Sequence, residues 1–253
     1  MTFAIPSRPK VLVHRGDAES CRIVRRGADA TVLHDGAVLT SAARKADLVF
    51  SFQADEKFCR DAISAGISVI VGNKMDSFSM MDLSARAKDR GTFLLGPGSM
   101  GLAVPGMFCA GVFPSDLIVR GDIGVVGFSS SALVETLNEM RVAGIGQSAV
   151  VHLGSAPLQG VSLHDAITAL QAHAATKVIL VVSSPWQCVD PVACVGKKQM
   201  VAFVPGASGS GQGQDLGRCS SRSDLLLRFR GQRVRAFSSM WGVCAHLRSI
   251  MPK

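Results

Sequence analysis

The sequence lacks several patterns that would assign it to a special class of protein. It has no C-x-x-C pair, and its seven cysteines are odd in number and widely spaced, which is typical of reduced thiols rather than of a disulfide framework or a zinc site. The uncharged segment 93–115 contains five glycines and three prolines, which excludes a membrane-spanning helix there. We therefore expect a soluble protein with no membrane partner.

Signals for secretion, metal binding and nucleic-acid binding are also missing. Pro6, Arg8 and Lys10 interrupt the apolar core that a signal peptide needs, so we expect a cytoplasmic location. No pair of the six histidines has the spacing of metal ligands on one face, so we expect no metal. Residues 205–253 hold eight basic and two acidic residues, or +6 of the total +8. The nearly neutral main body has no basic stripe, which disfavours nucleic acid as a partner.

Short apolar runs alternate with helical patterns over residues 9–204, and this alternation is typical of parallel sheets flanked by helices. An apolar content of 47% is enough to fill a sizeable core. We predict an α/β fold with two consecutive domains, in residues 1–120 and 121–204. The expected strands are residues 10–14, 30–34, 48–52, 68–72, 92–95, 123–126, 148–153, 177–182 and 199–204, and the expected helices are 54–66, 75–91, 130–142 and 163–172. Segment 95–121, dense in glycine and proline, is predicted to be a linker without a regular element.

Residues 205–253 differ in composition from the rest of the chain. They are rich in glycine and serine, then in arginine, and contain no glutamate. We expect an irregular basic tail, for which three interpretations stay open. It is a flexible linker followed by a short basic amphipathic helix, or an interaction tail, or out-of-frame translation appended to a truncated second domain.

The segment GDIGVVGFSSSALVETLNEM, residues 121–140, holds the most informative local pattern. An apolar strand runs into Gly127, which allows a sharp turn, and Ser129, Ser130 and Ser131 then open a helix. The free amides at such a helix start are suited to bind a phosphate or carboxylate. Serine is also among the best N-cap residues, so the same pattern fits a simple helix cap. From this pattern alone the two interpretations are equally supported.

Other loops also follow predicted strands. In open α/β sheets, ligands bind at the carboxyl ends of the strands. The ligand-loop candidates outside the serine segment are therefore Gly72, Gly96, Pro97, Gly98, Gly154 and Ser184.

Three runs in this order carry a family resemblance: FLLGPGSMGLAVPG, VRGDIGVVGFSSSALVE and AGIGQSAVVHLGSAPLQGVSLHDAI. They resemble the α subunit of succinyl-CoA synthetase and the wider NDP-forming acyl-CoA synthetases, and VRGDIGVVG is most similar to the FdrA-type proteins of that group. The resemblance covers roughly residues 47–204 and implies two doubly wound parallel-sheet domains. The first would be Rossmann-like and bind CoA, and the second would be flavodoxin-like and bind phosphate at its serine-rich turn.

The resemblance assigns roles to some residues and fails at others. Ser129 matches the motif serine, Ser131 the motif threonine and Glu135 the motif glutamate, so these residues with Gly127 and Ser130 form the implied phosphate site. Ser130 replaces the motif glycine, and His152 stands where the family usually has glycine. The segment corresponding to the family's phosphohistidine loop, VPGASGSGQGQ, has no histidine, and the glutamate that orients that histidine would fall near Ser184. Phosphohistidine chemistry is therefore not expected, and no catalytic residue is identified.

Three functions follow from these patterns. The first is an enzyme or enzyme subunit of the acyl-CoA synthetase type that binds an acyl or carbamoyl phosphate, with CoA as a candidate cofactor and a β-type subunit or a second copy as partner. Gly16 is the only glycine in the turn after the first strand, which weakens the case for CoA. The second is a non-catalytic regulatory or assembly relative of the same fold. Nonspecific nucleic-acid binding through the basic tail ranks third.

Overall fold

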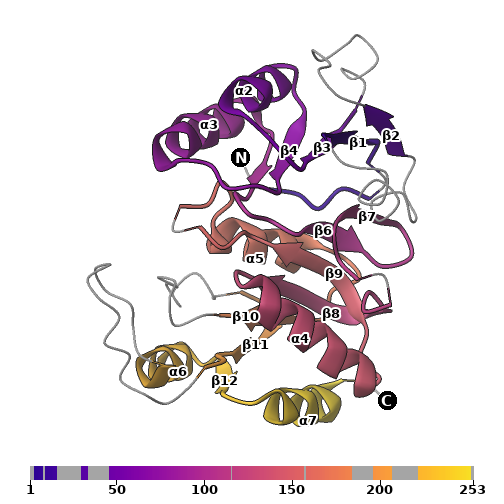
Figure 1. The fold of residues 1–253 in the computed structure, drawn as a ribbon. Helices are drawn as coiled ribbons and strands as arrows, with labels where there is room; N and C mark the ends of the chain where they lie inside the picture. The colour runs from indigo at the N-terminus through magenta and orange to yellow at the C-terminus, as the bar shows by residue number, and fades with distance from the viewer. Residues whose placement is uncertain are drawn as a thin grey trace.

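The computed structural model describes residues 3–7, 9–15, 30–33, 46–114, 116–156, 158–183, 196–206 and 222–251. In these ranges the chain forms two β-sheets, with helices α2 and α3 beside the first sheet and α4, α6 and α7 beside the second (Figure 1). No helix in these ranges combines the length and the apolar character needed to cross a bilayer.

The first sheet is parallel and has the strand order β2-β1-β3-β4-β5. Helices α2 and α3 pack on one of its faces, over Leu12, Val49 and Val69, and their N-caps are Asp55 and Asp76. The elements of this part are β1 (Val11–His14), β2 (Ala30–Leu33), β3 (Leu48–Ser51), α2 (Glu56–Ser64), β4 (Ser68–Val71), α3 (Ser77–Arg90) and β5 (Leu94–Leu95).

The second sheet has the order β12-β11-β10-β8-β9-β6-β7. Its parallel strands, read as β9-β8-β10-β11-β12, follow the order 2-1-3-4-5 of flavodoxin-like sheets. The elements are β6 (Gly101–Val104), β7 (Phe108–Gly111), β8 (Arg120–Gly127), α4 (Ser130–Val142), β9 (Gln147–His152), α5 (Leu163–Ala172), β10 (Val178–Val182), β11 (Gln199–Phe203), α6 (Arg222–Gly231), β12 (Arg235–Phe237) and α7 (Met240–Ile250).

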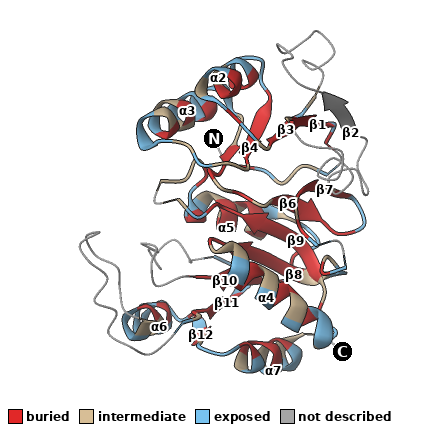
Figure 2. Cartoon of the chain, in the orientation of Figure 1, coloured by how far each residue is buried: buried red, intermediate tan, exposed pale blue. Residues whose placement is uncertain are grey.

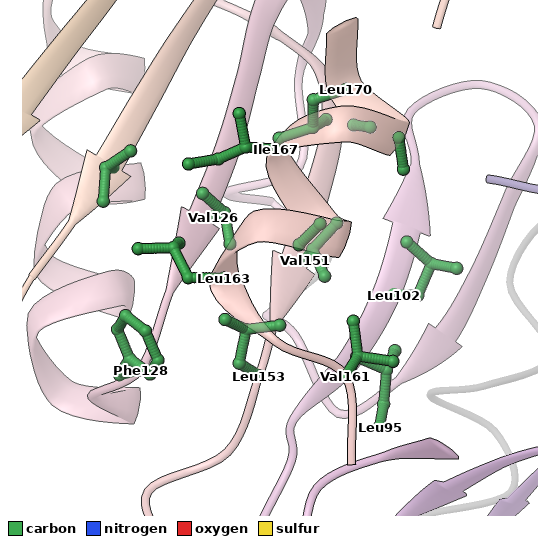
Figure 3. Close-up of a cluster of buried hydrophobic side chains, with 14 of the residues drawn as sticks. Leu95, Leu102, Val126, Phe128, Val151, Leu153, Val161, Leu163, Ile167 and Leu170 are labelled. Atoms are coloured by element: carbon green, nitrogen blue, oxygen red, sulfur yellow. The ribbon is translucent and has the colours of Figure 1, made fainter. Parts of the chain in front are cut away.

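Buried side chains cover both faces of the second sheet. Helices α4 and α7 pack on one face, whereas α5 and α6 pack on the other, where their core continues to the first sheet. Figure 3 shows Leu163, Ile167 and Leu170 of α5 beside Val126 and Val151 of the strands. Figure 2 shows the strands as largely buried and the outer helix faces as exposed. One hydrophobic core therefore contains side chains of both sheets.

The predicted α/β fold is confirmed, and α4 and α5 have the expected limits of 130–142 and 163–172. The prediction of a linker without regular structure over 95–121 is wrong, because β6 and β7 form an antiparallel hairpin that joins β9. Gly101 and Gly111 lie opposite each other, and a Cβ on either would meet the other strand's backbone at less than 3 Å. These glycines therefore permit close strand pairing instead of breaking the strands.

The C-terminal segment also differs from the expectation. Residues 222–251 are not irregular, since β12 pairs in parallel with β11 and Leu225, Phe229, Val243 and Leu247 are fully buried. Residues 207–221 lie outside the described ranges. The domain limits at residues 120 and 204 stay predictions, although β12 supplies the fifth strand of the flavodoxin-like order.

Candidate functional site

The serine turn, residues 127–131, lies where the direction of chain winding changes in the second sheet. Strand β8 ends at Gly127, whose neighbour in β10 is Val182. The strand order places β8 and β10 at the topological switch point, where doubly wound sheets bind ligands. A Cβ at position 127 would lie 3.3 Å from side-chain atoms of Leu133 and Val182. Glycine therefore lets α4 start close to both strands.

Helix α4 begins with its serines arranged around free amides. Ser129 is the N-cap, and its Oγ accepts from the Ala132 amide at 3.4 Å and lies 3.2 Å from the Ser131 Oγ. The Ser130 and Ser131 amides have no acceptor in the described part of the chain. Whichever of the paired hydroxyls donates to the other, the second keeps its proton for a ligand. The turn thus offers two amides and one hydroxyl at the positive end of a helix dipole.

A hollow of about 660 Å³ adjoins the turn. Ser130, Ser131 and Glu135 line it together with Met100, Leu117, Val134 and Asn138. Glu135 follows Ser131 by one helical turn, so the two side chains share one face of α4. Three of these residues, Ser130, Ser131 and Glu135, are candidates from the sequence, whereas Asn138 and the apolar Met100, Leu117 and Val134 are not.

The other candidate loops meet one another beside this site. The Gly96 amide donates to the Leu153 carbonyl at 3.1 Å, and the Gly98 amide donates to the Asn73 carbonyl at 2.8 Å. A Cβ on Gly154 would lie 2.3 Å from the Pro97 carbonyl oxygen. The loops that contain Gly72, Gly96 to Gly98 and Gly154 are thus packed directly together. Each position stays a candidate for ligand binding.

The end of β10 is described only in part. Ser184 lies outside the described residues. Its neighbour Ser183 is fully buried, and its hydroxyl has no hydrogen-bond partner in the described part of the chain. In the same part of the chain, no group of three or more His, Cys, Asp and Glu side chains is arranged to hold a metal ion.

His152 connects the serine turn to the loop that precedes β6. It ends β9, is fully buried, and its Nδ1 accepts from the Met100 amide at 2.9 Å. Its Nε2 lies 3.4 Å from the Ser130 Oγ. Ser99 reinforces the link, because its Oγ donates to the His152 carbonyl at 2.5 Å and accepts from the Gly101 amide at 3.0 Å. Sequence patterns gave no signal for these contacts, because they join residues more than 50 positions apart.

The hydrogen bonds define the protonation of His152. Burial lowers the pKa of His152 to about 4, and a backbone hydrogen bond with Phe128 offsets only part of this effect. The ring is therefore neutral near pH 7 and carries one proton. Because Nδ1 accepts from Met100, that proton is on Nε2, which faces both the Ser130 Oγ and the Phe128 backbone. His152 is a hydrogen-bond donor to the turn.

The stability of the protein is expected to depend on pH through His152. The unfolded histidine has a pKa near 6.5, whereas the folded one has a pKa of about 4. The unfolded state therefore binds more protons in this window, and stability falls as the pH decreases through it. Between about pH 7.5 and about pH 5, this group should remove about 2 kcal/mol of unfolding free energy. Urea unfolding of wild type and His152→Gln at both pH values measures the difference, and equal losses would contradict it.

Comparison with known proteins identifies relatives over part of the chain. No protein-family model matches it. The succinate–CoA ligase (ADP-forming) subunit alpha 1 of Archaeoglobus fulgidus is 29% identical in an alignment 160 residues long, which covers 59% of this chain and 55% of the relative. The chain spans about half the length of the curated relatives it matches. The expected similarity to succinyl-CoA synthetase α subunits is confirmed, whereas the narrower FdrA-type similarity is not.

Solved structures share the fold over almost the whole chain. ATP citrate lyase from Methanothrix soehngenii, solved with citrate and coenzyme A, matches 98% of this chain and 51% of its own, with a TM-score of 0.75 and 16% identity. The dinucleotide-forming acetyl-coenzyme A synthetase 1 of Ca. Korarchaeum cryptofilum matches 92% of this chain and 59% of its own, with a TM-score of 0.74 and 14% identity. At these identities the likeness establishes the α/β fold.

Proposed function

We propose that this chain is an enzyme subunit of the acyl-CoA synthetase type, and that its serine turn binds the phosphate group of an acyl or carbamoyl phosphate. One observation carries the proposal: the free amides of Ser130 and Ser131 lie at the switch point of a flavodoxin-like sheet. The named relatives are subunits of CoA ligases, which supports the same class of reaction.

The turn would stabilise the negative charge of the phosphate rather than form a covalent bond with it. When a nucleophile attacks the carbonyl carbon of an acyl phosphate, the bond between that carbon and the phosphate oxygen breaks. The phosphate leaves with the electron pair and gains negative charge. The Ser130 and Ser131 amides, with a hydroxyl of the Ser129–Ser131 pair, would stabilise that charge in a fixed geometry. Glu135, in the same hollow, would disfavour ligands with further negative charge on that side.

Coenzyme A and a second subunit belong to the proposal as well. When bound, coenzyme A would supply the thiol that accepts the acyl group. The carboxyl edge of the first sheet offers the Asn73 loop and the buried His14–Ser51 pair, in which Nδ1 and Oγ lie 2.8 Å apart. Residues 16–29, which follow β1, lie outside the described ranges. The support for coenzyme A is therefore the fold and the relatives. A β-type subunit is proposed because the relatives are named as alpha subunits.

The state of His152 favours a second candidate function, that of a non-catalytic relative that binds phosphate compounds. Its Nε2 carries a proton and its Nδ1 lone pair is used by the Met100 amide. Its ring is also fully buried. His152 therefore has no free nitrogen with which to accept a phosphoryl group, and it does not replace the family's missing histidine.

Calorimetry with inorganic phosphate, carbamoyl phosphate, acetyl-CoA and CoA tests the proposed function. We expect wild type to bind the phosphate compounds and the double variant Ser129→Ala, Ser131→Ala to bind them at least about tenfold more weakly, because each hydroxyl bond to a charged group contributes about 1.5–3 kcal/mol. Formation of acyl-CoA from acetyl phosphate and CoA would separate the enzyme from the non-catalytic relative.

Ser162→Ala is the matched control. Ser162 is the N-cap of α5 and accepts from the Asp165 amide at 3.1 Å, so its loss removes a helix cap away from the turn. It should cost about 1 kcal/mol of stability and leave the phosphate affinity unchanged. Absence of phosphate binding to wild type, or equal weakening by the control, would overturn the proposed site.

A further inference from the structure

The three serines of the turn point in two directions. The Ser129 and Ser131 hydroxyls pair with each other, and Ser131 is exposed. The Ser130 hydroxyl instead lies 3.4 Å from the Nε2 of a fully buried histidine. The Ser130 hydroxyl is thus directed toward His152, while the exposed Ser131 remains at the mouth of the site.

The direction of the Ser130 side chain matters for the amides beside it. A free serine hydroxyl readily accepts from its own or a neighbouring backbone N–H. At the first residue of α4, those N–H groups are the ones that would bind an anion. A Ser130 hydroxyl released from the interior would therefore compete with the ligand for the same donors.

His152 is held in place to prevent this competition. Its Nδ1 accepts from the Met100 amide, which fixes the ring and places the proton on Nε2. The Ser99 hydroxyl donates to its carbonyl and fixes the backbone. The Nε2–H donor, which faces Ser130 and the Phe128 backbone, is therefore oriented by contacts on the opposite side of the ring.

We propose that His152 is a positioning residue for the anion site: its Nε2–H holds the Ser130 hydroxyl inward, so that the amides at the start of α4 stay free for phosphate. This inference rests on the proposed function, because it concerns the same turn. It adds a residue that does not touch the ligand and that acts only through Ser130.

Two buried polar variants of His152 separate this role from packing. Glutamine places an amide N–H near the position of Nε2 and keeps the donor toward Ser130. Asparagine places an oxygen near the position of Nδ1, keeps the acceptor for Met100 and cannot reach Ser130. We expect phosphate affinity in His152→Gln to remain within about twofold of wild type, and that of His152→Asn to fall about three- to tenfold, the value of one neutral hydrogen bond.

The same pair is then measured in the Ser130→Gly background by calorimetry with inorganic phosphate. Without a side chain at position 130, His152→Gln and His152→Asn should bind phosphate equally. A difference that persists in that background would show that His152 acts through packing, and this inference would be overturned. Equal affinities of the two variants with Ser130 present would overturn it too, while phosphate binding by wild type would still support the proposed function. If wild type binds no phosphate, both proposals fail.

Discussion

Gly154→Ala is expected to lower the free energy of unfolding by about 3 kcal/mol or more, the sum of backbone strain and overpacking at one position. Gly154 has φ of +105°, a conformation that side chains with a Cβ rarely adopt. Its Cβ would also lie 2.3 Å from the Pro97 carbonyl oxygen, on backbone that cannot rotate away. The loops after β5 and β9 would have to separate.

Gly144→Ala is the control, because it introduces backbone strain without a steric clash. Gly144 follows α4, has φ of +71°, and no heavy atom lies within 4 Å of an added Cβ. Its replacement should cost only about 1–2 kcal/mol. Urea unfolding followed by far-ultraviolet circular dichroism compares the two variants. Equal losses would show that contact between the loops of Pro97 and Gly154 does not restrict the side chain at position 154.

Local pattern was sufficient to predict helices α2, α3, α4 and α5 and most strands. Helix α4 was predicted with its limits because Ser129 is a strong N-cap and Leu133, Leu137 and Met140 repeat at helical spacing. The β6–β7 hairpin was missed because Gly101 and Gly111 have the same appearance in a sequence whether they break strands or allow them to pair closely. Only the partner strand distinguishes these cases, and it is supplied by the fold.

The candidate site was predicted in its backbone but not in its side-chain contacts. Gly127 and the three serines form a turn and a helix start, and both can be recognised from the local sequence. The contact between Ser130 and His152 depends on the register of β8 and β9, which places residues 22 positions apart side by side. One signal was present: both positions depart from glycine in the family pattern. Two departures that contact each other are informative only once the fold shows the contact.

The tail shows how composition can mislead. Its glycine, serine and arginine content suggested an irregular segment, whereas residues 222–251 complete the sheet and its helical layers. Arg248 donates from Nη2 and Nε to the carbonyl of Ala143, the C-cap of α4, at 2.6 and 3.2 Å. A cation at this end complements the helix dipole. The tail therefore supports the helix whose other end forms the serine turn.

Leu247→Ala is expected to destabilise the protein by about 2–5 kcal/mol, the cost of a cavity in a packed core. Leu247 lies in α7, is fully buried, and belongs to the same hydrophobic cluster as Leu137 and Met140 of α4. Trp241, on the same helix, is 82% exposed, so Trp241→Ala should change stability by less than about 0.5 kcal/mol. Urea unfolding of both variants measures the contrast. If α7 is part of the core, Leu247→Ala must lower the free energy of unfolding more than Trp241→Ala does, although tryptophan is the larger side chain. Comparable, small effects would instead mean that the tail contributes nothing to the core, as expected of an appended segment.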